Sequence, residues 1–154
     1  MKRATFLVTT TNRPHLLAQA LAHLVPAPLD GWETDVCIVG RPDDPGIIAA
    51  QEAQPLLEAT VGRFWTVGAD TDVVTQKINA ALPLLDCDLV LLADDDDLQS
   101  PGRLARAVES YDAGAHWSGE SMILFVDFAT GAVARWDGDA RMAGTTLNYR
   151  RDFL

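Results

Sequence analysis

The chain has 154 residues, of which 48% are hydrophobic and 22% charged, so it fits one folded domain and not a disordered segment. Its formal net charge of -10 argues against a general electrostatic grip on nucleic acid or anionic lipid. It has neither 18 consecutive apolar residues nor the apolar segment of a signal peptide, so we expect a cytoplasmic protein without membrane insertion. Cys37 and Cys87 lie in apolar stretches and are expected to be reduced and buried.

Strand and helix patterns alternate through the first 114 residues. The expected strands are 6–8, 35–39, 64–67 and 88–93, and the expected helices are 14–24, 45–59, 74–85 and a segment from Pro101 to Gly114. Ser100 is the expected cap of the last helix, and Pro83 should kink or shorten the third. Right-handed crossovers place these strands in one mainly parallel sheet, where ligands bind at the carboxyl ends of the strands.

The last forty residues have a different character. Strand-like runs at 122–128 and 132–136 flank a turn at Ala129–Gly131, and 145–149 is one more strand candidate. The predicted fold class is therefore α/β, with a mainly parallel Rossmann-like sheet flanked by helices and a C-terminal part rich in β-hairpin. We expect a single domain, with residues 1–114 as its ligand-binding half and 115–154 as its β-rich part.

An acidic run, Asp94-Asp95-Asp96-Asp97, follows the most apolar strand. Four adjacent carboxylates repel one another, and a hard divalent cation such as Mg²⁺ or Mn²⁺ relieves that repulsion. Residues two apart on an extended chain face the same way, so Asp94 and Asp96 are predicted to act together. The alternative is a solvated acidic turn that favours the following helix N-terminus.

The turn after the first strand reads Thr9-Thr10-Thr11-Asn12-Arg13-Pro14. Its hydroxyls, amide and guanidinium beside a helix N-terminus suit a nucleotide base and a phosphate, whereas the alternative is an ordinary capped turn. Lys77 and Asn79 lie off the apolar face of the helix before the acidic strand, and Arg41 follows the second strand. A solvated surface is the simpler explanation for each. The sequence has no glycine-rich dinucleotide loop, no P-loop and no Gly-x-Ser-x-Gly elbow.

Three motifs in this order resemble the GT-A glycosyltransferases, specifically the inverting family 2. They are the Thr-Asn-Arg-Pro turn, Lys77-Ile78-Asn79-Ala80-Ala81, and the acidic run followed by Leu-Gln-Ser-Pro-Gly-Arg-Leu. Tyr149-Arg150-Arg151 is similar to a late strand of that family. The resemblance implies a GT-A sheet and transfer of a sugar, with inversion, from a nucleotide-sugar donor, most simply a UDP-sugar, to an acceptor hydroxyl.

The same resemblance assigns site residues. The nucleotide-sugar set is Thr9, Thr10, Arg13, Asp43, Lys77, Asp94 and Asp95, and the set for Mn²⁺ or Mg²⁺ is Asp94, Asp96 and Asp97. The metal would stabilise charge on the departing nucleotide. The family usually has an acidic residue directly after the second strand, where this chain has Gly40-Arg41-Pro42-Asp43-Asp44, so Asp43 or Asp44 is the expected substitute.

Inverting transfer also needs a carboxylate that deprotonates the acceptor hydroxyl. The candidates are Glu120, Asp127, Asp137 and Asp139. Asp137 and Asp139 are preferred because they follow the hairpin in a glycine-containing loop, whereas Asp127 is expected to be central in a strand. Trp117 and Trp136 are candidates for stacking on an acceptor sugar, against the simpler hypothesis that they pack in the core or hairpin.

Three alternatives remain at this point. A sugar nucleotidyltransferase would also use acidic metal ligands, although it usually has a glycine-rich basic loop after the first strand, which this chain lacks. A non-catalytic module would bind nucleotide sugar or metal without turnover. A structural domain would bind neither.

Overall fold

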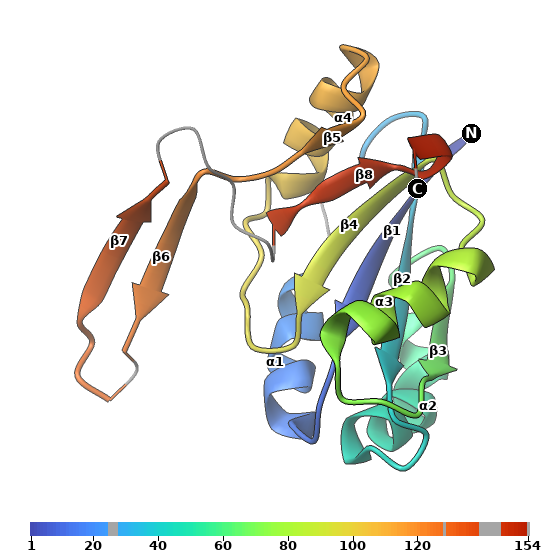
Figure 1. Ribbon diagram of the computed structural model, residues 1–154, viewed down its shortest axis with the longest axis vertical. Coiled ribbons are helices and arrows are strands. Elements are labelled where there is room, and N and C mark those ends of the chain that lie inside the picture. The colour runs from blue at the N-terminus through green and yellow to red at the C-terminus, as the bar shows by residue number, and fades with distance from the viewer. Residues whose placement is uncertain (25–27, 128, 139–145, 154) are drawn as a thin grey trace.

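The structure is a computed structural model that describes residues 1–24, 28–127, 129–138 and 146–153. Six strands form one sheet in the order β3-β2-β1-β4-β8-β5 (Figure 1). Their bounds are β1 Lys2–Thr9, β2 Trp32–Gly40, β3 Phe64–Gly68, β4 Leu89–Asp94, β5 Trp117–Ser118 and β8 Asn148–Arg150. The first four strands are mutually parallel, whereas β8 runs antiparallel to β4 and β5. The predicted mainly parallel α/β sheet is confirmed.

Helices cover both faces of this sheet because its strands are apolar on both sides. The helices are α1 Pro14–Leu24, α2 Pro45–Leu57, α3 Val74–Ala81 and α4 Arg103–Asp112, with short 3-10 turns η1 Leu82–Leu84 and η3 Arg151–Phe153. Phe6 and Val8 of β1 belong to the apolar cluster under α1, α2 and α4, and Leu7 belongs to the cluster under α3. As expected, α3 ends before Pro83, and the chain continues there as η1.

The start of α4 differs from the prediction. Gly102 occupies the cap position and makes no side-chain cap. Ser100 is used in other ways: its carbonyl accepts from the Arg103 amide at 2.9 Å, and its hydroxyl accepts from Arg106 Nη2 at 3.2 Å. The turn that these contacts form delays the helix to Arg103.

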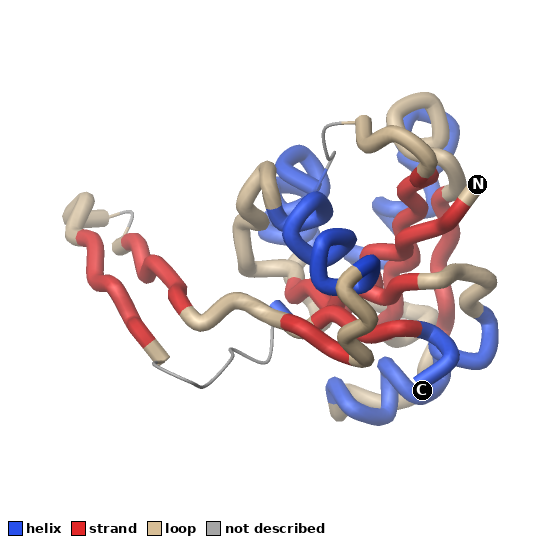
Figure 2. The backbone as a smooth tube through the Cα atoms, turned by 90° about the horizontal axis from the view of Figure 1, so that it is seen from above, coloured by secondary structure: helices blue, strands red, loops and turns tan. Residues whose placement is uncertain are grey.

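The remaining two strands, β6 Met122–Val126 and β7 Val133–Asp137, form a separate antiparallel hairpin. Both views show this hairpin standing apart from the six-stranded sheet (Figures 1 and 2). Asp127 was expected inside a strand, but it lies after β6, where it accepts the amides of Ala129 and Thr130 and the Thr130 hydroxyl. These hydrogen bonds hold the pKa of Asp127 below its usual value.

The two thiols differ. Cys37, in the middle of β2, is fully buried, and burial raises its pKa to about 12. Cys87 was expected to be buried but is half-exposed, because it precedes β4 in a loop. Both cysteines are free. In the described ranges, no helix combines the length and apolarity needed to cross a bilayer.

Candidate functional site

The register of β1 against β4 joins the two predicted motifs. Thr9 lies directly opposite Asp94 although 85 residues separate them, and Thr9 Oγ1 donates to Asp94 Oδ1 at 2.7 Å. The next residues continue the pattern, because Thr10 Oγ1 donates to Asp95 Oδ2 at 2.7 Å. The hydroxyl turn and the acidic run therefore form one edge, at the carboxyl ends of two central parallel strands.

The four aspartates of the acidic run differ in burial. Asp95 is fully buried, Asp94 and Asp97 are half-buried, and the side chain of Asp96 is 44% exposed. Asp95 thus anchors the turn from inside the protein, through the Thr10 hydroxyl and, at 3.3 Å, the Thr11 amide. Asp96 is the one exposed residue of the four, and Asp94 keeps one oxygen, Oδ1, bound to the Thr9 hydroxyl.

Arg13 lies at this edge, directly before α1. Its Nη2 is 2.5 Å from Asp95 Oδ1, and its Nη1 is 2.5 Å from Asp96 Oδ2. The guanidinium therefore bridges a buried and an exposed carboxylate and offsets part of the repulsion within the run.

Lys77 is the largest departure from the sequence analysis. A solvated position was the simpler explanation, yet its side chain is fully buried. Its Nζ donates to the Thr10 carbonyl at 2.6 Å and to the Thr11 hydroxyl. Lys77 supports the turn from below, so it places positive charge under the edge without facing solvent.

After β2, the structure distinguishes Asp44 from Asp43. Asp43 is exposed and ion-paired with Arg41 at 3.2 Å. Asp44 is buried, caps α2 by accepting the Gly46 amide at 2.7 Å, and accepts the Asn12 amide at 2.5 Å. Asp44 therefore holds the far end of the turn, where Asn12 has a positive φ of 52°.

Gly40, the last residue of β2, permits this close arrangement. A Cβ there would lie 2.9 Å from Thr10 Cγ2 and 3.2 Å from the Thr10 carbonyl oxygen. Any larger residue would displace the turn from its anchors.

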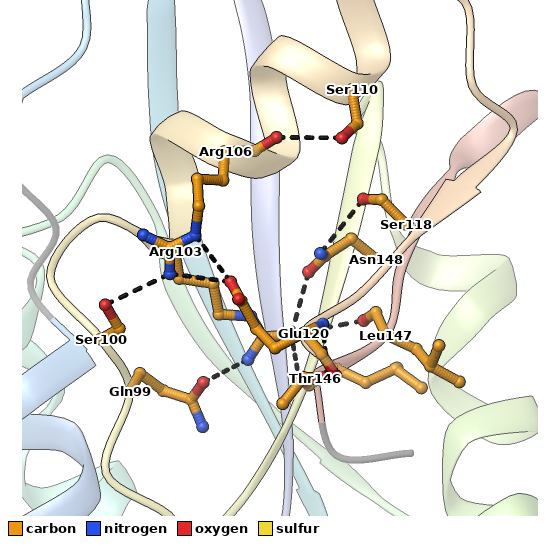
Figure 3. Close-up of polar contacts among 11 residues, drawn as sticks. Gln99, Ser100, Arg103, Arg106, Ser110, Ser118, Glu120, Thr146, Leu147 and Asn148 are labelled. Atoms are coloured by element: carbon orange, nitrogen blue, oxygen red, sulfur yellow. Dashed lines mark hydrogen bonds and ion pairs between the residues drawn. The ribbon is translucent and has the colours of Figure 1, made fainter. Parts of the chain in front are cut away.

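A second polar network braces the other side of β4 (Figure 3). Arg103 of α4 is buried, and its Nη2 donates to the Leu92 carbonyl at 2.6 Å, the Leu147 carbonyl at 3.3 Å and Asn148 Oδ1 at 2.9 Å. Its Nη1 donates to Gln99 Oε1. Burial lowers the pKa of Arg103 to about 10. This side chain ties β4 to β8 two residues before Asp94.

Beside it, Arg106 donates twice to Glu120 Oε1, at 2.9 and 2.7 Å (Figure 3). The Glu120 amide donates to the Thr146 hydroxyl at 2.9 Å. Glu120, one of the four candidate bases, is therefore engaged as an ion-pair partner of α4.

Of the two preferred base candidates, Asp137 does not come to the acidic edge. Asp137 ends β7 on the separate hairpin, 2.6 Å from Arg135, and Asp139 lies outside the described residues. Trp117 is 52% exposed and Trp136 is 37% exposed, so neither is a core residue. Trp136 lies on the hairpin, opposite Ile123.

A divalent metal was expected at Asp94, Asp96 and Asp97. Within the described ranges, no three His, Cys, Asp or Glu side chains converge in a set that could hold an ion. The residues fit a more open site, because Asp96 is exposed, Asp94 is half-buried, and a guanidinium already serves as the cation on Asp96. Magnesium commonly takes one or two carboxylates and completes its shell with water and substrate phosphates.

Sequence reasoning missed the roles of Arg103, Asn148 and Asp44. A signal existed for Asp44, because Asp followed by Pro at a helix start is typical of an N-cap. For Arg103 and Asn148 no local signal existed, since their contact depends on β8 pairing with β4.

Fold and edge together define the class of molecule as an α/β protein with a GT-A-like sheet. No protein-family model matches the sequence, and no curated protein matches it. Solved structures do match. One is the mannosyltransferase PcManGT from Pyrobaculum calidifontis in complex with GDP-Man and Mn²⁺, with a TM-score of 0.64 and 18% identity over 98% of this chain and 45% of that chain.

A second is TarS 1-349 from S. aureus, with a TM-score of 0.61 and 17% identity over 98% of this chain and 47% of that chain. TarS 1-349 in complex with UDP-GlcNAc matches with a TM-score of 0.61 and 16% identity, over 98% of this chain and 46% of that chain. The chain thus spans about half the length of these matching chains. At this identity the likeness shows the fold.

Proposed function

We propose that this chain binds a nucleotide-sugar donor at the edge formed by β1 and β4 and acts as a metal-dependent, inverting glycosyltransferase. The observation that carries the proposal is the joined edge itself. Thr9 and Thr10 are hydrogen-bonded to Asp94 and Asp95, and Asp96 is exposed beside them. The ligands of the matching structures, GDP-Man with Mn²⁺ and UDP-GlcNAc, support the same class of donor.

Each part of this edge has a separate role in the proposal. Asp94 and Asp96 would hold Mn²⁺ or Mg²⁺, which supplies positive charge to a departing nucleoside diphosphate. The turn is fixed by Asp95, Lys77 and Asp44, and its threonine hydroxyls are engaged inside the protein, so it would present its accessible residues, Thr11 and Asn12, to the nucleotide. Arg13 would add a guanidinium fork that matches phosphate geometry.

Titration calorimetry with UDP and GDP, with and without Mn²⁺, tests the binding step. We expect metal-dependent nucleotide binding in the wild type and its loss in Asp96→Asn. Asp70→Asn is the control, because Asp70 is also an exposed, arginine-paired carboxylate that follows a strand of the same sheet. Equal nucleotide binding by wild type and Asp96→Asn would contradict the site assignment.

A binding module without turnover is the second candidate. It is favoured by the position of Asp137, which ends β7 in an ion pair with Arg135, on a hairpin that stands apart from the six-stranded sheet (Figure 1). If Asp137 is nevertheless the base, Asp137→Asn should bind the donor normally and lose sugar transfer to a panel of acceptors. Donor binding with neither transfer nor donor hydrolysis in the wild type supports the binding module.

A further inference from the structure

Arg13 holds two carboxylates of unequal character. Asp95 is fully buried and is fixed a second time by the Thr10 hydroxyl, whereas the Asp96 side chain is 44% exposed and reaches solvent. The two guanidinium nitrogens divide between them, Nη2 on Asp95 and Nη1 on Asp96, each at 2.5 Å. The Nη2 end of the guanidinium is thus bound to a buried, fixed carboxylate, and the Nη1 end to an accessible one.

Asp96 is also the carboxylate that the metal site requires. A divalent ion bound to Asp96 would lie close to the Arg13 guanidinium, and two cations at such short range repel strongly. Occupation of Asp96 by the guanidinium and by the metal is therefore competitive. The Asp95 contact has no such conflict, because Asp95 points into the protein.

We propose that Arg13 serves as the resident cation of Asp96 when no metal is bound, and that metal binding displaces its Nη1 end toward the donor diphosphate. The inference rests on the proposed function. Asp95 keeps the guanidinium tethered through Nη2, so the displaced end stays at the edge. Arg13 then couples the two ligands: the metal frees the group that binds the diphosphate, and the diphosphate stabilises that displaced position.

Neighbouring cations cannot replace Arg13 in this role. Lys77 is buried, and its ammonium is bound to the Thr10 carbonyl and the Thr11 hydroxyl. Arg41 follows the adjacent strand but pairs with Asp43 and Asp70, each at 3.2 Å. Arg13 bridges Asp95 and Asp96 with two separate nitrogens, which a lysine ammonium does not reproduce.

The test measures Mn²⁺ binding without any nucleotide, from the electron paramagnetic resonance signal of the free ion. Arg13→Gln removes the competing charge, so we expect it to bind Mn²⁺ about fivefold to tenfold more tightly than the wild type, within the usual range of coupling between sites. Arg41→Gln is the matched control, since it removes an equally exposed arginine from a neighbouring strand end and should leave Mn²⁺ affinity unchanged.

A second titration adds UDP or GDP, whichever the wild type binds. In the wild type the nucleotide should tighten Mn²⁺ binding, and in Arg13→Gln this tightening should shrink at least severalfold. Arg13→Lys keeps the charge but not the bridge, so it should resemble Arg13→Gln in coupling. Circular dichroism confirms that each variant is folded, and if Arg13→Gln does not fold, Arg13→Lys alone decides on the coupling.

The outcomes separate the two proposals. Unchanged or weaker Mn²⁺ binding by Arg13→Gln, with nucleotide binding that depends on Asp96, overturns the exchange and leaves the proposed function standing. Tighter Mn²⁺ binding without nucleotide binding by any protein supports the competition at Asp96 and overturns the donor site. Absence of Mn²⁺ binding by wild type and variant alike overturns both.

Discussion

Two strands that each contain an apolar run, β1 and β6, have opposite surroundings in this molecule. In β1, Phe6, Leu7 and Val8 are at most 2% exposed, because the strand lies between β2 and β4 and is covered on both faces. In β6, Leu124 and Phe125 are 56% and 58% exposed, because the hairpin pairs with nothing else in the described structure. The contrast teaches that local pattern predicts a strand, whereas burial depends on what the chain later brings beside it.

The largest expected effect on stability comes from a substitution in the buried sheet. Leu91→Ala in β4 should lower the free energy of unfolding by about 3 kcal/mol, because Leu91 is fully buried and its truncation leaves a cavity. Phe125→Ala, measured by the same urea titration, should cost below about 1 kcal/mol, because most of that ring is already in water. Equal costs would show that the hairpin is packed in solution.

A smaller effect concerns the interior of the sheet, where the buried Cys37 thiol should make stability depend on pH. The Cys37 thiol keeps its proton in the folded state to a pKa of about 12, whereas the unfolded thiol titrates near 9.0. The unfolded state then binds fewer protons above pH 9, so stability falls as pH rises, by about 1 kcal/mol at pH 10. Cys37→Ala should lack this part of the alkaline decline in urea titrations at pH 8 to 10. An unchanged slope would mean that the interior is wetter than its packing implies.

The smallest effect on stability concerns the hairpin. The double variant Phe125→Ser, Trp136→Ser should change the free energy of unfolding by less than about 1 kcal/mol. The same pair should reduce binding of a hydrophobic fluorescent dye, since both rings lie on one face of the ribbon beside Ile123 and Ala134. Strong destabilisation without a change in dye binding would contradict the exposed arrangement.

The first four strands and their helices were predictable because the hydrophobic periodicity and the prolines and glycines at element ends indicate the same boundaries there. The apolar run at 88–93, for example, is the length of a buried parallel strand, and Pro83 ends α3 as expected. The predicted late strand at 145–149 is β8 at Asn148–Arg150, and the two-residue β5 was missed. The bounds of β8 and the existence of β5 depend on pairing with distant strands, and such pairing leaves no periodic pattern in the local sequence.

The candidate site was predictable in its residues but less so in their roles. Two strand ends with polar residues identify Thr9, Thr10, Asp94 and Asp96. The sequence did not show that Asp95 is fully buried, because that depends on which way the chain turns after β4. Nor did it show that Lys77 is buried, since the space below the Thr10 turn exists only in the assembled sheet.

The pairing of β1 with β4 has a consequence for synthesis on the ribosome. β2 is translated soon after β1, yet the other edge of β1 stays open until Leu89–Asp94 has emerged. A nascent chain interrupted between β3 and β4 therefore exposes an apolar strand edge that invites misassembly. Asp95 is translated just after this strand, so the Thr10 hydroxyl gains its carboxylate partner only when the open edge is closed.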